Sequence, residues 1–273
     1  MHVAFVHDLS PMGGAEVSTL HLFEVAKQQD IEVTPIGPGS KLPEVDAVVF
    51  SGVEYFSFSE REKVFKKYKP TKIPFVLWDH HVGTGGMHPT MWRRLFHCAR
   101  ATIFVSPLHA KTRWDQYDVI HDEVVLPVGV GPEDFYPNAS VRRADDWAVC
   151  MMSRIGKKGR RRLDEYIESH SHLKFHIFSS FQSDHPNVFV HPVVPRELLP
   201  DLYSSAMYHI DLPCRIMAAG NATYESVLCG CTPVVNEFVG AASWDWAWYD
   251  QEILRQKLIE GNLEFWNVVK GVA

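Results

Sequence analysis

The sequence has no apolar run long enough to cross a membrane. Its 273 residues contain no stretch approaching the roughly 20 apolar residues that a transmembrane helix needs. The opening residues, from Met1 to Val6, lead directly into a strand pattern and lack the basic and then apolar layout of a secretory signal. We therefore expect a soluble, cytoplasmic protein, for which a peripheral membrane contact stays open.

Cysteine is scarce as well, and acidic residues outnumber basic ones by 33 to 27. The five cysteines are odd in number and scattered through apolar segments, which favours reduced thiols over a disulfide framework. Cys229 and Cys231 form a C-x-C pair, but no second Cys/His pair stands at zinc-like spacing, so we expect no metal site. The net charge of −6 argues against general affinity for nucleic acid.

One segment departs from this acidic balance. Six of the nine residues from Arg154 to Arg162 are cationic, a density that attracts phosphate on a nucleotide or on a polymer. For Arg160, Arg161 and Arg162 we favour a solvated helix start. For Arg154 and Lys158 we favour phosphate binding, on the resemblance described below.

Short apolar, β-branched runs alternate with helical patterns along the whole chain. Predicted strands cover 3–7, 31–36, 47–51, 75–78, 102–105, 123–127, 147–153, 174–179, 188–191, 209–212 and 232–236. Predicted helices cover 15–28, 59–68, 90–98, 108–117, 161–169, 195–204, 221–228 and 244–260. Strands this apolar indicate parallel sheets covered on both faces, and hence the α/β class.

A polar stretch at 138–146 separates two such series of strands and helices. We predict two Rossmann-like, doubly wound domains, at 1–137 and 147–261, that face a cleft. Apolar residues recur in the last segment, 262–273, and predict a C-terminal helix able to pack back on the first domain.

The segment 219–235 is the most informative part of the chain. It reads as a glycine-containing loop, a short helix and an apolar strand. Asn221 is a suitable N-cap, and the backbone N–H groups of Gly220, Asn221, Ala222 and Thr223 can receive an anion such as a diphosphate. Glu225, one turn further on, can accept hydrogen bonds from paired hydroxyls such as those of a ribose. The segment therefore predicts a sugar-nucleotide site.

Two earlier loops also follow predicted strands. Gly13 and Gly14 form a Gly-Gly turn between a strand and a helix, where a backbone can approach a ligand closely, although a plain βα turn fits equally well. His80 ends another buried strand, at a place where an imidazole can donate a hydrogen bond to a substrate or shuttle a proton. A solvent-facing turn is the alternative for His80.

These segments, taken in order, resemble GT-B glycosyltransferases, particularly the retaining GT4-like enzymes (glycosyl transferases group 1). The segment 219–235 resembles the family's Gly…Glu-x-x-x-x-Gly-x-Pro-Val-Val, and 13–16 resembles its Gly-Gly-Ala-Glu. The segment 78–81, Trp-Asp-His-His, takes the place of Trp-x-His-Asp, and 147–159 resembles the strand and Arg…Lys-Gly loop that open the donor domain. The resemblance spans nearly the whole chain.

The resemblance implies transfer of a sugar from a nucleoside diphosphate donor, with retention of configuration and without metal or other cofactor. It assigns Arg154 and Lys158 to the donor diphosphate, with Lys157 as the alternative lysine. It places His80 beside the transferred sugar and Glu225 on the ribose. A glycan, a lipid-linked molecule or a small molecule is the expected acceptor.

Some positions depart from the family pattern. Met217 stands eight residues before Glu225, where relatives carry a glutamate that contacts the donor sugar. The chain is short, and 128–131 reads Val-Gly-Val-Gly in place of Asn-Gly-Val-Asp. A non-catalytic or weakly active nucleotide-sugar-binding protein is therefore the main alternative. A GT-B-like epimerase or phosphorylase and a transferase acting on nucleic acid are weaker ones. The base, sugar, acceptor and oligomeric state stay undetermined.

Overall fold

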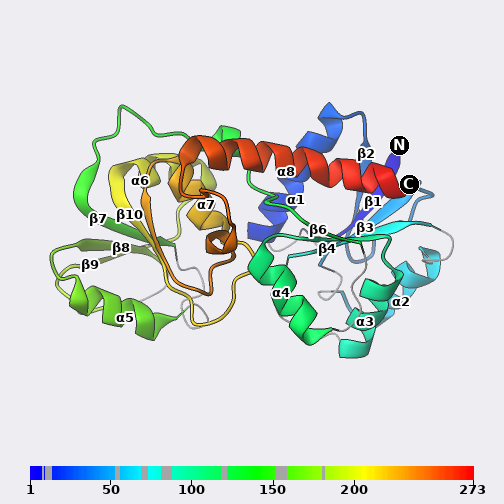
Figure 1. The fold of residues 1–273 in the computed structure, drawn as a ribbon, viewed down its shortest axis with the longest axis horizontal. Coiled ribbons are helices and arrows are strands. Elements are labelled where there is room, and N and C mark those ends of the chain that lie inside the picture. Colours follow the sequence, from blue (N-terminus) through cyan, green and yellow to red (C-terminus); the bar gives the residue numbers. More distant parts are fainter. Residues whose placement is uncertain are drawn as a thin grey trace. The chain divides into compact units, whose positions relative to one another are not determined.

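The computed structural model describes residues 1–7, 9, 14–52, 56–68, 73–80, 88–117, 122–151, 159–179 and 182–273. The chain divides into two compact units (Figure 1). Unit 1 consists of Met1–Gly129 and Leu258–Ala273, and unit 2 of Val130–Lys257. Both units are α/β, as the sequence predicts, and every predicted strand is present with small differences at its ends.

Unit 1 holds a six-stranded parallel sheet in the order β2-β1-β3-β4-β5-β6. Its strands are β1 (His2–Val6), β2 (Glu32–Ile36), β3 (Ala47–Phe50), β4 (Phe75–Asp79), β5 (Ala101–Phe104) and β6 (Glu123–Val125). Its connecting helices are α1 (Gly14–Gln28), α2 (Phe58–Lys67), α3 (Pro89–Cys98) and α4 (Pro107–Gln116). The strand order reverses at β1, which lies between β2 and β3.

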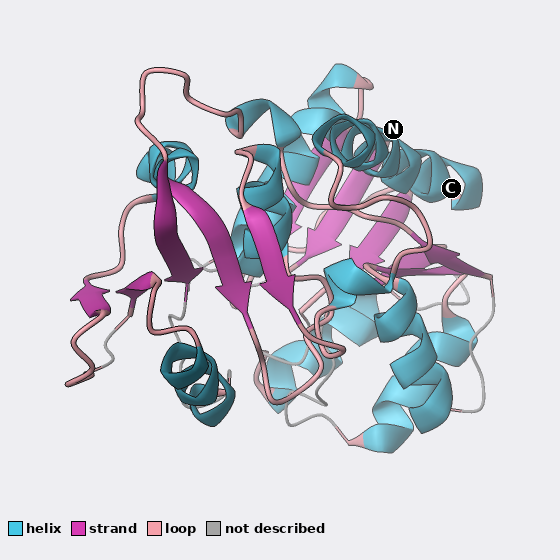
Figure 2. Ribbon diagram, turned by 60° about the vertical axis from the view of Figure 1, so that its left-hand side comes forward, coloured by secondary structure: helices cyan, strands magenta, loops and turns pink. Residues whose placement is uncertain are grey.

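Unit 2 holds a five-stranded parallel sheet in the order β11-β10-β7-β8-β9 (Figure 2). Its strands are β7 (Ala144–Met151), β8 (Lys174–Phe178), β9 (Val188–His191), β10 (Ala206–Asp211) and β11 (Thr232–Val235). Its helices are α5 (Arg160–Ser169), α6 (Leu199–Ser205), α7 (Asn221–Leu228) and the short 3-10 turns η2 (Pro132–Asp134), η3 (Arg196–Leu198) and η4 (Gly240–Ser243). Here the order reverses between β7 and β10.

Local sequence signals start several of these helices. Ser57 and Glu60 form a reciprocal capping box at α2. Ser106 accepts a hydrogen bond from the backbone N–H of His109 at α4, and Pro107 occupies the first helical position. No helix among the described residues combines the length and the apolar character of a membrane span.

The end of the chain differs from its prediction. A single helix, α8 (Gln251–Val272), replaces a helix at 244–260 followed by a separate terminal one. It begins at 251 because the Asp250 carboxylate accepts the backbone N–H groups of Glu252 and Ile253. It continues through Gly261, where only a glycine fits, because a side chain there would collide with the backbone carbonyl oxygen and the ring of Pro127. This glycine marks a close approach of two backbones and not the end of a helix.

A buried ion pair fixes the end of β4. Arg113 of α4 donates two hydrogen bonds to the Asp79 carboxylate, at 2.6 and 3.2 Å, and its guanidinium lies over the Trp92 ring. His109 approaches the same carboxylate at 3.5 Å. Burial by itself would raise the pKa of Asp79, but His109 and Arg113 outweigh that effect and hold this pKa well below its usual range. Asp79 is therefore an ionised, fully compensated anchor.

Replacing Asp79→Asn should destabilise unit 1 by about 3–5 kcal/mol at pH 7, because the buried Arg113 loses its counter-ion. The pKa of Asp79 is lower in the folded than in the unfolded state, so its contribution to stability is present above about pH 4 and falls as the pH drops toward the folded pKa. Chemical denaturation at pH 7 and at pH 3 measures both effects. The exposed Asp115→Asn on the same helix is the control, and a variant as stable as the control would contradict the anchor role.

Candidate functional site

The reversal of strand order in unit 2 gathers the segments that follow β7 and β10. Adjacent strands whose connections leave in opposite directions open a crevice at their carboxyl ends, and ligands of doubly wound sheets bind there. Arg154, Lys157 and Lys158 follow β7 but lie outside the described residues. The described chain resumes at Gly159, where a side chain would collide with the backbone from Leu212 to Cys214, just after β10. The two connections are thus in direct contact.

Helix α7 covers the predicted residues, 221–228, but its N-cap differs from the prediction. Its N-cap is Gly220, with φ of 92°, so the prediction of Asn221 as N-cap is wrong. A left-handed backbone favours glycine, and a side chain at this position would also meet Val239. Asn221 and Ala222 are the first helical residues, and no side chain caps this end of the helix. The Thr223 hydroxyl donates to the Asp211 carboxylate at the end of β10, which ties α7 to the strand before it.

Glu225 lies one turn into α7 and is only 5% exposed. Its carboxylate accepts a hydrogen bond of 2.6 Å from Arg196, at the start of η3, and the Arg196 guanidinium lies 4.8 Å from the centre of the Phe135 ring. Burial raises the pKa of Glu225; Arg196 opposes this rise and Asp134 adds to it. Glu225 is therefore a buried carboxylate that Arg196, its one oppositely charged partner among the described residues, compensates only in part.

The sequence did not predict Arg196. The sequence predicts a strand at 188–191 and a helix at 195–204 around it, and neither pattern marks Arg196 as a site residue. A cation 29 residues before a buried carboxylate carries no spacing signal, because the contact depends on how β9 and β10 are ordered in the sheet. The three-dimensional arrangement is needed to find it.

Met217 lies in the connection between β10 and α7 and is held by its backbone. Its N–H donates to the carbonyl of Phe238 at 2.8 Å, and its own carbonyl accepts from Gly240 at 3.0 Å. The side chain is half-buried. Both contacts involve backbone atoms and make no use of the Met217 side chain.

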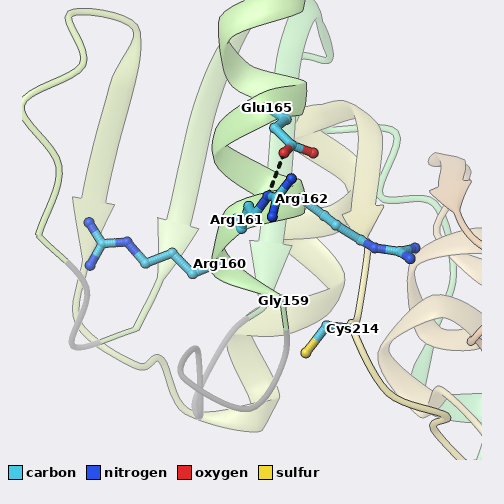
Figure 3. A pocket seen from close by; sticks show the side chains of 6 residues that line it. All are labelled: Gly159, Arg160, Arg161, Arg162, Glu165 and Cys214. Carbon is cyan, nitrogen blue, oxygen red and sulfur yellow. Dashed lines mark hydrogen bonds and ion pairs between the residues drawn. The ribbon is translucent and has the colours of Figure 1, made fainter.

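A pocket of about 800 Å³ opens at the start of α5 (Figure 3). It is lined by Gly159, Arg160, Arg161, Arg162, Glu165 and Cys214. Arg160 and Arg161 pair with Asp164 and Glu165 one turn along the same helix, and both arginine side chains are more than half exposed. They form the solvated helix start that the sequence predicts. Arg162 instead pairs with Glu237 and lies over the Phe238 ring.

A second polar cluster lies at the carboxyl ends of three strands of unit 1. His7 follows β1, Ser51 follows β3 and His80 follows β4. The Ser51 hydroxyl lies 2.7 Å from His80 Nε2 and 3.2 Å from His7 Nδ1, and His7 Nε2 lies 3.4 Å from the Glu16 carboxylate. The sequence predicted His80 alone of these residues as a site residue. Gly13 lies outside the described residues, while Gly14 is the first residue of α1.

Solved structures resemble this chain over most of its length. HepE from Anabaena in complex with UDP matches with a TM-score of 0.73 and 13% identity, covering 99% of this chain and 100% of that one. Sucrose-phosphate synthase from Thermosynechococcus elongatus matches with a TM-score of 0.68 and 13% identity, covering 88% and 82%. An α-glucosyltransferase in complex with UDP and a 13-mer DNA matches with a TM-score of 0.62 and 12% identity, covering 97% and 90%.

The chain has the GT-B fold. The resemblance in sequence predicted this fold, and these structural matches confirm it. The sequence itself matches no family model and no curated protein. At 10–13% identity the GT-B matches show the architecture, and the chemistry must be argued from the residues of this chain.

Arg196→Met should lower the stability of unit 2 by roughly 2 kcal/mol at pH 7, because it leaves the Glu225 charge buried without its partner. The effect is smaller than for a fully buried pair since the Arg196 side chain keeps 31% of its surface exposed. Because the pKa of Glu225 is raised on folding, the stability linked to its protonation is present below about pH 4 and is lost as the pH rises through the folded pKa.

The deficit of Arg196→Met should therefore be large at pH 7 and small at pH 4. Thermal unfolding at the two pH values measures it, with the exposed Arg142→Met as the control. An equal deficit at both pH values would show that Arg196 acts by packing on Phe135 and not by its charge.

Proposed function

We propose that the protein is a glycosyltransferase that moves a sugar from a nucleoside diphosphate donor to an acceptor hydroxyl. The observation that carries the proposal is the placement of Glu225. This buried carboxylate stands one turn into the helix that follows β10, beside the reversal of strand order in unit 2. An uncapped helix start receives a phosphate, and a carboxylate one turn away accepts two vicinal hydroxyls.

Binding of the nucleotide would divide among several groups of unit 2. Backbone N–H groups at Gly220, Asn221 and Ala222 would face the diphosphate, and Glu225 would hold the ribose. The N–H of Thr223 instead donates to the Gly220 carbonyl at 2.9 Å. Arg196 supports this role because it holds one oxygen of the Glu225 carboxylate at 2.6 Å and so fixes the orientation of the other. HepE, a fold relative, has been solved with UDP and with UDP-glucose, which supports a nucleoside diphosphate sugar as the donor.

The transfer step requires stabilisation of the departing diphosphate. In our proposal Arg154 and Lys158 supply that charge, with Lys157 as the alternative lysine, and no metal ion takes part. His80 would contact the sugar in transfer, and Gly13 and Gly14 would admit phosphates and acceptor close to the backbone. We propose retention of configuration and a GT4-like relationship on the resemblance in sequence.

A nucleotide-sugar-binding protein without transferase activity is the second candidate, and Met217 favours it. A thioether cannot take over the hydrogen bonds of the glutamate that GT4-like enzymes carry at this position. The hydrogen bonds that hold the loop at Met217 are made by its backbone and not by its side chain. Loss of that carboxylate would therefore remove contacts to the sugar and leave the nucleotide contacts of Glu225 intact.

Glu225→Gln should weaken nucleoside diphosphate binding roughly 10- to 100-fold, the range expected when a hydrogen bond to a charged group is lost. A thermal-shift screen across UDP-, GDP-, ADP- and dTDP-sugars first identifies the base, because ligand binding raises the unfolding temperature by mass action. Calorimetry then compares the diphosphate of that base with its 2′-deoxy analogue on the wild type and on Glu225→Gln.

The wild type should prefer the ribonucleotide, and Glu225→Gln should lose this preference. Glu168→Gln, an exposed glutamate of α5, is the control and should retain both affinity and preference. Equal affinity of the wild type for the two nucleotides would contradict the assignment of Glu225 to the ribose. Absence of binding to any nucleotide would contradict the proposed function.

A further inference from the structure

His7 is a buried imidazole with hydrogen-bond acceptors on both sides. Only 1% of its surface is exposed. Its Nδ1 lies 3.2 Å from the backbone carbonyl of Ser51, and a carbonyl oxygen can only accept, so Nδ1 carries a proton. Its Nε2 faces the Glu16 carboxylate at 3.4 Å, which also accepts, so Nε2 carries a proton as well. The two contacts together describe an imidazolium and its counter-ion.

Glu16 and the backbone at Gly52 keep the His7 ring in this position. Glu16, from the first turn of α1, is itself buried, so its charge acts across a short and poorly solvated distance. Gly52, with φ of 67°, follows Ser51, and a side chain there would approach to 2.6 Å from His7 Nδ1. The backbone can therefore bring the Ser51 carbonyl onto the ring only because residue 52 is a glycine.

The proton on His7 Nδ1 decides the direction of the next hydrogen bond. The Ser51 hydroxyl lies 3.2 Å from the protonated Nδ1 of His7, so its oxygen accepts on that side. Its own proton is then available for His80 Nε2, at 2.7 Å. A ring nitrogen that accepts a hydrogen bond carries no proton, and a neutral imidazole carries one proton on its two nitrogens. A neutral His80 that accepts at Nε2 is therefore protonated on Nδ1.

We propose that Glu16, His7 and Ser51 form a hydrogen-bonded chain that holds His80 in the tautomer protonated on Nδ1. The three are positioning residues, because they act on His80 and not on a substrate. The relevance of that tautomer to sugar transfer rests on the proposed function of His80. The chain itself is a property of unit 1 and can be tested without any donor, so the two proposals can fail separately.

Long-range proton–nitrogen NMR correlation spectra of the uniformly ¹⁵N-labelled protein report the protonation of each imidazole nitrogen. His7→Gln and His80→Gln identify the two sets of signals by their disappearance. At pH 7 the wild type should show His7 protonated on both nitrogens and His80 protonated on Nδ1 alone.

Ser51→Ala removes the donor to His80 and should shift its tautomer population toward the Nε2-protonated form, while Ser51→Thr keeps the hydroxyl and should restore the wild-type pattern. Glu16→Gln should remove the charge of His7 and leave it protonated on Nδ1 alone, because the Ser51 carbonyl still requires a donor on that side, so the tautomer of His80 should stay as in the wild type. Thr102→Val removes another buried hydroxyl from the same sheet and should change neither signal.

A neutral His7 in the wild type would overturn the proposal. So would a His80 protonated on Nε2 in the wild type, or a His80 tautomer that is the same in the wild type and in Ser51→Ala. Each of these outcomes is independent of whether the protein turns over a sugar nucleotide.

Discussion

Parallel pairing of strands is the constraint on which both candidate sites depend. In a parallel sheet all carboxyl ends meet at one edge, and a reversal of strand order sends neighbouring connections to opposite faces. In unit 1 this brings His7, Ser51 and His80 together, although 44 residues separate the first pair and 29 the second. In unit 2 it brings the residues after β7 into contact with those after β10. Neither cluster exists as a local feature of the sequence.

Two of the buried carboxylates, Asp79 and Glu225, differ in a way that fits the anchor role of Asp79 and the ligand role proposed for Glu225. Asp79 receives two hydrogen bonds from a fully buried arginine and a third contact from His109, and its pKa is lowered. Glu225 receives one from a partly exposed arginine, and its pKa is raised. Full compensation suits an anchor, whereas a carboxylate with remaining capacity to accept hydrogen bonds suits a ligand site. Burial alone would not separate the two roles.

The fold could be predicted from the sequence because each strand is a distinct apolar run bounded by polar turns. The predictions of helix ends were wrong where a residue type that is common at helix ends has another structural role. Gly261 reads as the end of a helix but lies inside α8, where it permits contact with Pro127. Asn221 reads as an N-cap but follows Gly220, whose left-handed backbone starts the helix.

The candidate site could be predicted only in part, for a different reason. Glu225 and His80 stand within motifs that resemble a family, whereas Arg196, His7 and Ser51 gain their meaning from partners distant in sequence. Arg154 and Lys158 remain predictions from resemblance, since they lie outside the described residues. A sequence motif therefore indicates the residues proposed to contact the ligand. The residues that orient them can be identified only from the three-dimensional structure.

Turnover of a donor in the absence of acceptor tests the central claim most directly. The sugar nucleotide that most raises the unfolding temperature is incubated with the protein, and the anomeric proton signals are followed by NMR. If the protein transfers the sugar to water, the nucleoside diphosphate and the free sugar should be released slowly. The free sugar should first carry the same anomeric configuration as the sugar of the donor. The opposite result is a donor that binds tightly and stays intact, both alone and after addition of glycan, lipid-linked and small-molecule acceptors. That result would contradict transferase activity and leave a nucleotide-sugar-binding protein.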